Sequence, residues 1–171
     1  MRKHILVIMS LMLMGFVANN CQAAEKNACI NLEMVFNEYQ KTKDEEAKLT
    51  QIGEEKQKEI DVKLKEIDQM EEDMDLMNDS EKEKMKVKLD KKMEELRQFD
   101  RQIRADLMRQ RNEIIKGILD EIDNTVQEYG KSKGYNIIFN SRTAILYQNK
   151  NLDITQTMIE YLNKSYKKRK K

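Results

Sequence analysis

The sequence predicts an α+β fold that is mostly α, in which a long antiparallel helical hairpin, a coiled-coil arm, projects from a small β base. Charged residues make up 37% of the 171-residue chain and Pro is absent, as is typical of long exposed helices. Through the middle of the chain the apolar residues recur at a helical period. Near both ends they alternate with polar residues, which indicates strands. The length predicts one domain.

Residues 1–23 are predicted to be a signal peptide. Arg2 and Lys3 precede the apolar run Ile5–Val17, and small residues follow it. This run of about 13 residues is shorter than the roughly 20 that a membrane-spanning helix needs. We expect cleavage near Ala23 and export of the mature chain.

Two other interpretations of this segment stay open. It could remain as an uncleaved N-terminal anchor, or Cys21 could be acylated as in a lipoprotein. Asn20 argues against acylation, because a small residue is expected before such a cysteine.

The composition argues against most kinds of chemistry. After cleavage Cys29 is the only cysteine, and the only histidine, His4, is lost with the signal peptide. We therefore predict no catalytic residues, no metal site, no cofactor and no enzymatic activity. The 32 basic and 31 acidic residues nearly balance, so no overall charge favours nucleic acid.

The mature chain is expected to begin with a strand. The segment "ACINLEMVF", residues 28–36, alternates apolar and polar residues. This alternation predicts one buried face, made of Ala28, Ile30, Leu32, Met34 and Phe36.

A first helix is predicted over residues 38–77. Its later half carries apolar residues three or four apart, close to the coiled-coil period: Ile60, Leu64, Ile67, Met70, Met74 and Met77. The break comes at residues 78–80, where Ser80 and Glu83 match a capping box and predict a second helix from residue 81.

The second helix is predicted to run to residue 129 and to end between Gly130 and Gly134. Its apolar stripe contains Met85, Leu89, Met93, Leu96, Phe99, Ile103, Leu107, Ile114, Ile118, Ile122, Val126 and Tyr129. Two long helices joined by so short a connection must run antiparallel.

The C-terminal region is predicted to return to β structure. Tyr135, Ile137 and Phe139 lie on one face of a strand, residues 140–143 form a turn, and residues 144–148 form a second strand. Asp153 is expected to cap a last helix, whose apolar face contains Ile154, Met158, Ile159 and Leu162. The basic residues after Lys164 are expected to fray.

These terminal segments have matching apolar faces and are expected to meet. So small a sheet is marginal alone, so we expect several copies of the chain to share its core in an obligate homo-oligomer. The base then comprises residues 24–36 and 130–165, the arm residues 37–129, and a basic tail residues 166–171. The predicted oligomerisation core contains Ile30, Leu32, Met34, Phe36, Tyr135, Ile137, Phe139, Ile145 and Tyr147.

At both ends the sequence resembles the Skp/OmpH family of periplasmic chaperones. The two matching segments are "ACINLEMVFNEY" and "KGYNIIFNSRTAILYQNKNLDITQTMIEYLNK". The resemblance implies a periplasmic homotrimer with three helical arms around a cavity. It implies that these arms bind unfolded outer-membrane proteins without ATP and keep them from aggregating. One departure is the acidic stretch "DQMEEDMDLMND" before the arm turn, where arms of the family are often basic.

On this reading the flexible apolar side chains near the arm turn are the candidate client-binding residues: Ile60, Leu64, Ile67, Met70, Met74, Met77, Met85, Leu89 and Met93. The same residues are equally compatible with an ordinary seam between two helices. The basic tail is expected to aid solubility, with weak contact to an anionic membrane surface as the alternative. The rival function is a coiled-coil adaptor of the cell envelope that binds a single folded partner.

Overall fold

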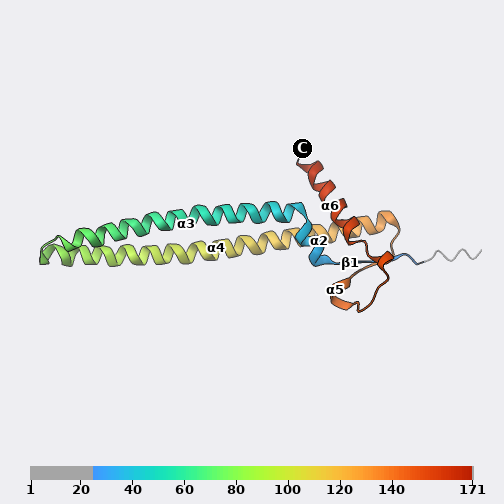
Figure 1. Cartoon of the computed structure of the whole chain (residues 1–171), viewed down its shortest axis with the longest axis horizontal. Coiled ribbons are helices and arrows are strands. Elements are labelled where there is room, and N and C mark those ends of the chain that lie inside the picture. Colours follow the sequence, from blue (N-terminus) through green and yellow to red (C-terminus); the bar gives the residue numbers. More distant parts are fainter. Residues whose placement is uncertain (1–24, 171) are drawn as a thin grey trace, which may run out of the picture.

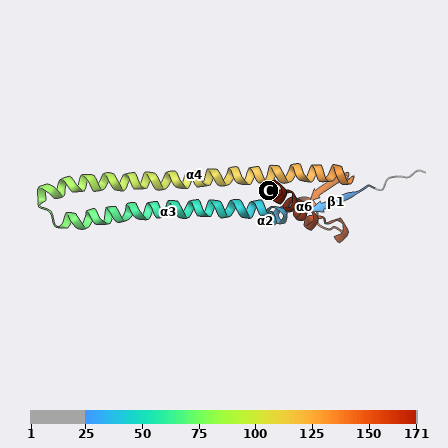
Figure 2. The same cartoon turned by 90° about the horizontal axis from the view of Figure 1, so that it is seen from above.

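The computed structural model describes residues 25–170, and the predicted signal peptide therefore lies outside the described residues. Two long helices, α3 (Gln40–Asp75) and α4 (Asp79–Lys133), form an antiparallel hairpin, and every other element gathers at its open end (Figures 1 and 2). At 1.5 Å per residue, α3 spans about 54 Å and α4 about 82 Å. The predicted mostly helical α+β fold is confirmed. The smaller elements are β1 (Asn27–Ile30), α2 (Leu32–Glu38), β2 (Ile137–Asn140), α5 (Ser141–Ala144), η1 (Lys150–Leu152) and α6 (Thr155–Arg169).

The turn at the far end of the hairpin is capped by a different pair of residues from the pair predicted. The Asn78 side chain accepts a hydrogen bond from the Glu81 backbone N–H at 3.1 Å, and the Glu81 carboxylate accepts one from the Asn78 N–H at 3.3 Å. The predicted cap at Ser80 was therefore two residues late. Asn and Ser are comparably good caps, so the sequence alone did not decide between them.

The end of α4 shows why glycine occurs there. Gly134 has a φ of 69° and its N–H donates to the carbonyls of Gly130 and Lys131, so the predicted glycine cap is confirmed at this position. Gly130 instead lies within the helix, which continues four residues past the predicted end. A Cβ on Gly130 would lie 3.3 Å from Ile138 Cδ1, so the glycine lets β2 approach α4 closely.

Gly134→Ala is expected to lower the free energy of unfolding by about 1–2 kcal/mol, because an L side chain at this left-handed φ is strained. Gly117→Ala is the matched control. Its Cβ would have no neighbour within 4 Å and the backbone there is ordinary α4 helix, so it should raise the free energy of unfolding by up to about 1 kcal/mol. Urea unfolding measures both. Equal shifts of the same sign would contradict this account.

The segments before and after the hairpin meet in a parallel pair of strands. β1 pairs with β2 in the register Asn27 to Ile137 and Ile30 to Asn140. A parallel pair needs a long crossover connection, and here the entire hairpin serves as that connection. The predicted meeting of the first strand with the segment after Gly134 is confirmed.

Two of the three predicted strands differ from the structure. The first strand stops at Ile30, and residues 32–38 form α2 because the Asn31 side chain caps it by accepting a hydrogen bond from the Met34 N–H at 3.0 Å. Helical winding places Val35 and Tyr39 on one face, and both are fully buried. The predicted strand at 144–148 is also wrong: α5 occupies 141–144, and residues 145–149 are irregular.

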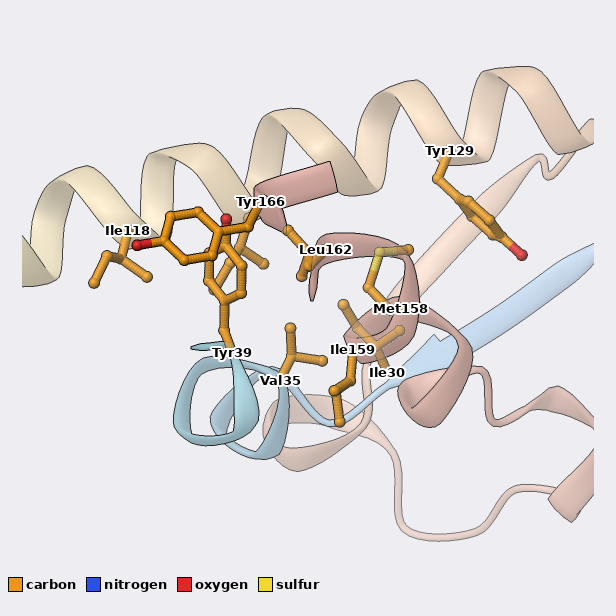
Figure 3. Close-up of a cluster of buried hydrophobic side chains, with 10 residues drawn as sticks. Ile30, Val35, Tyr39, Ile118, Tyr129, Met158, Ile159, Leu162 and Tyr166 are labelled. Atoms are coloured by element: carbon orange, nitrogen blue, oxygen red, sulfur yellow. The ribbon is translucent and has the colours of Figure 1, made fainter. Parts of the chain in front are cut away.

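The hydrophobic core lies where α2, α4 and α6 meet, beside β1 (Figure 3). Its largest fully buried side chains include Tyr39, Ile118, Ile122, Met158 and Leu162. The predicted burial of Met158, Ile159 and Leu162 is thus confirmed.

The two ends of α6 both differ from prediction. The helix begins at Thr155, one residue later than an Asp153 cap implies, although the Asp153 carboxylate still accepts a hydrogen bond from the Thr155 N–H at 2.9 Å. The expectation of a frayed tail was wrong, since α6 continues to Arg169 and Tyr166 is buried.

Candidate functional site

Most of the predicted client-binding residues lie in the seam between α3 and α4. Ile67 and Leu89 are buried there, and Leu64 is exposed. The remaining members are half-buried: Ile60, Met70, Met74, Met77, Met85 and Met93. A two-helix arm has one seam, so these side chains mainly hold the helices together and expose only their edges. Their role in binding stays a prediction.

A wider apolar surface lies at the opposite end of the arm, where it joins the base. A groove of about 520 Å³ opens there between α3 and α4. Apolar side chains from three helices line it: Phe36 of α2, Leu49 of α3, and Leu107, Met108, Ile114, Ile115 and Ile118 of α4. A second hollow of about 290 Å³ shares Phe36 and Ile115 with it and adds Leu32 and Leu119. We call Phe36, Leu49, Met108, Ile115 and Leu119 the root surface.

The root surface arises from three apolar doublets in α4: Leu107-Met108, Ile114-Ile115 and Ile118-Leu119. The first residue of each doublet belongs to the stripe that faces the rest of the fold. The second points about 100° further round the helix and therefore extends the apolar face beyond the seam. Met108 remains 67% exposed and Leu119 37%. These second residues were not among the predicted site residues, although the doublets were a usable signal.

Charges of both signs border the groove. Glu45 and Glu46 lie on the α3 side and Arg111 lies on the α4 side. Lys48 forms an ion pair with Glu45 at 2.7 Å. An apolar floor with a mixed rim can accept an apolar side chain whose neighbours along its own chain are polar or charged.

Two carboxylates join α6 to the root of the arm. Glu121 of α4 accepts hydrogen bonds from the Tyr39 hydroxyl at 2.7 Å and from Lys41 at 2.6 Å, and it also pairs with Arg169. Partial burial raises the pKa of Glu121, but the hydrogen bonds and the charges of Lys41 and Arg169 outweigh this and hold it below its usual value. Burial and the bond to Glu121 raise the pKa of Tyr39.

Asp44 of α3 is the second of these carboxylates. It accepts hydrogen bonds from Lys170 at 2.5 Å, from Gln40 at 2.9 Å and from the Tyr166 hydroxyl at 3.0 Å. These bonds lower the pKa of Asp44 from 3.8 to about 2. The charged form is therefore favoured by the folded state.

Asp44→Asn is expected to destabilise the fold near neutral pH but not in acid. Because the folded pKa of Asp44 is depressed to about 2, its stabilising contribution is complete above its usual pKa of 3.8 and is lost as the pH falls through about 2. Melting temperatures of wild type and variant should differ by a constant amount from pH 5 to 8 and converge towards pH 2. A gap that persists unchanged at pH 2 would contradict the assignment.

The predicted oligomerisation residues divide into two groups. Ile30 is buried within the single chain, and Leu32, Phe36, Tyr135 and Ile145 are half-buried. The others are exposed: Met34, Ile137, Phe139 and Tyr147. Leu146, beside Tyr147, is fully exposed as well.

The part of the chain that the structure covers shows no arrangement for metal chemistry. Residues 25–170 contain no group of three or more His, Cys, Asp or Glu side chains that could hold a metal ion. Cys29 is buried in β1, and burial, together with the charge of Asp153, raises the pKa of its thiol. No helix in this range has the length and apolar character that a membrane crossing requires.

The fold and the root surface together define an arm-and-base protein with an open apolar groove. A family model described as outer membrane protein (OmpH-like) matches residues 26–162, and the chain belongs to this OmpH-like family. Membership supports a chaperone role in general. No curated protein matches the chain.

A solved structure supports the same fold. An OmpH-like protein from Caulobacter crescentus CB15, proposed to be an outer membrane chaperone, superposes with a TM-score of 0.75. The match covers 81% of this chain and 84% of the other, with 12% identical residues. At this identity the likeness establishes the fold, and the predicted family resemblance is confirmed by the family model.

Proposed function

We propose that the chain is an ATP-independent periplasmic holdase that binds unfolded outer-membrane proteins and prevents their aggregation in transit. The observation that carries this proposal is the root surface, an open apolar groove on an otherwise highly charged arm. Membership of the OmpH-like family adds independent support. Export by cleavage of residues 1–23 belongs to the same proposal.

The chemistry of the root surface suits such clients. Strands of an outer-membrane barrel alternate apolar and polar residues, so an unfolded one presents apolar side chains at regular intervals between polar ones. The groove can take the apolar side chains while Glu45, Glu46 and Arg111 face the polar ones. Met108 adds a flexible, polarizable side chain that adapts to many shapes, as binding without sequence selectivity requires.

The proposal includes assembly into a homotrimer. Within residues 25–170, β2 pairs only with β1, which leaves its other edge without a partner strand. Ile137 and Phe139 of β2 are exposed, as are Leu146 and Tyr147 in the irregular segment that follows α5. A free strand edge beside exposed apolar side chains favours pairing with another copy, which would bury both. Three arms would then enclose a space into which clients fit.

The root surface is tested by Met108→Glu. We expect this variant to suppress the aggregation of a denatured outer-membrane barrel protein less well than wild type, because a charge in the groove opposes apolar binding. Val87→Glu is the matched control, since Val87 lies on the same helix, is 64% exposed, and does not line the groove. Light scattering after dilution of the client from urea measures the effect.

Two outcomes would count against the holdase. One is wild-type protein that fails to suppress aggregation at several-fold excess. The other is an equal loss of suppression in the Met108 and Val87 variants, which would remove the role of the groove. A pull-down distinguishes the holdase from the adaptor alternative. An adaptor should recover one folded partner, whereas a holdase should recover many unrelated envelope proteins.

A further inference from the structure

One of the two arm helices, α3, joins the base through a single non-helical residue, whereas α4 runs unbroken from the arm into the core. α2 ends at Glu38 and α3 begins at Gln40, while Tyr39 between them adopts an extended conformation with φ −69° and ψ 123°. A one-residue break between two helices is a natural pivot, because a change at its φ and ψ redirects the first turns of α3 relative to α2. What holds Tyr39 therefore decides how the start of α3 leaves the base.

The helix that follows this break is capped by a distant residue. Tyr39 supplies no side-chain cap to α3. The Asn163 side chain of α6 instead accepts a hydrogen bond from the Gln40 N–H at 2.7 Å and donates one to the Glu38 carbonyl at 3.3 Å. One side chain of α6 thus satisfies a free backbone group on each side of the break.

The end of α6 also holds both helices of the arm. Arg169 pairs with Glu121 of α4 and donates a hydrogen bond to the Tyr39 hydroxyl at 3.2 Å. Lys170 pairs with Asp44 of α3 at 2.5 Å. Tyr166 packs edge-on against the Tyr39 ring, with ring centres 5.8 Å apart, and the two labelled rings lie side by side in Figure 3.

These contacts should stabilise the fold more than ordinary surface ion pairs do. The Glu121 and Asp44 side chains are only 19% and 21% exposed, and each accepts bonds from several donors. Networks around shielded carboxylates contribute more than isolated exposed pairs. The first turns of α6 are fixed in the core through Met158 and Leu162, so its last turns are held in position.

We propose that Asn163, Tyr166, Arg169 and Lys170, which we call the C-terminal clamp, lock a hinge at Tyr39 and so hold the start of α3 in place beside α4 and the base. Weakening the clamp frees the start of α3 to open while the first turns of α6 stay packed in the core through Met158 and Leu162. This role does not depend on what the root surface binds. It gives the basic C-terminus an intramolecular function in place of the solubilising tail predicted from the sequence.

The test compares two double variants in the full chain. Arg169→Ala with Lys170→Ala removes both ionic contacts of the clamp. Lys167→Ala with Lys168→Ala removes the same charge from the same helix, at residues that form no ion pair within 25–170. Hydrogen exchange of the Gln40 and Lys43 amides reports on opening at the break, and exchange of the Met158 amide reports on undocking of α6.

We expect the clamp variant to exchange about 5- to 30-fold faster at Gln40 and Lys43, with Met158 unchanged. The control variant should match wild type at all three amides. In wild type, exchange at Gln40 should also accelerate with added salt, and the clamp variant should lose this dependence. Asn163→Ala should accelerate hydrogen exchange of the Gln40 amide without changing that of the Met158 amide.

Three results would overturn the clamp. They are unchanged exchange in the clamp variant, equal acceleration in the control variant, and acceleration that is the same at Met158 as at Gln40. The last result would mean that α6 leaves the core as a whole, so that no separate hinge exists.

Discussion

Leu162→Ala is expected to lower the free energy of unfolding by about 2–5 kcal/mol, the range for truncating a fully buried leucine. Leu162 is 1% exposed and packs in the core cluster with Met158 and Ile122. Its removal leaves a cavity at the place where α6 meets α2 and α4. Because the neighbouring side chains are close-packed and held by helices, we expect most of the cavity to remain.

Leu64→Ala is the matched control for this substitution. It makes the same chemical change on α3, but Leu64 is 42% exposed, so the loss should stay below about 1 kcal/mol. Urea unfolding followed by circular dichroism measures both. A loss for Leu162→Ala no larger than that for Leu64→Ala would show that α6 is not part of the stabilising core.

Ile137→Asp is expected to dissociate the proposed homotrimer. Ile137 is 47% exposed in the single chain, so the substitution should disturb the fold of one copy little. If other copies cover this side chain, the variant places an unpaired charge in the shared interface, which is strongly unfavourable. The mass in solution, measured by light scattering, should fall from three copies to one.

Asn136→Asp controls for the added charge, since Asn136 adjoins Ile137 and is exposed. Its mass should equal that of wild type. A wild-type protein that is a stable monomer, or an Ile137 variant that keeps the full assembly, would refute the assignment of this surface to the interface. Leu32→Asp, on the half-buried side of the same predicted core, should act like Ile137→Asp.

Long periodic segments were the most predictable part of the fold. The stripe through α4 extends over more than ten apolar positions, so single ambiguous residues do not change its interpretation. The cap at Gly134 was predictable because glycine alone readily adopts its backbone conformation. The short segments were not, because residues 32–36 fit a strand by alternation and a helix by the capping residue Asn31.

The candidate site was less predictable than the fold. The methionines near the arm turn were predicted to bind clients because of their residue type. In the structure, packing between α3 and α4 half-buries them. The root surface depends on how α4 is rotated about its axis relative to α3, α2 and the base. The doublets indicate a widened apolar face on α4 but not which elements that face contacts. The clamp was hidden for a further reason: Lys170 and Asp44 lie 126 residues apart, and no local pattern links them.

The parallel pairing of β1 with β2 has a consequence for how such a molecule can change size. The hairpin starts and ends at the same pair of strands. Glu66 on the outgoing helix forms an ion pair with Lys92 on the returning helix, so the two helices run in step. Matched insertions or deletions of whole turns in both helices would therefore change the length of the arm without shifting a residue of β1 or β2. The length of the arm can therefore change, in evolution or by design, separately from the strand pairing that anchors it.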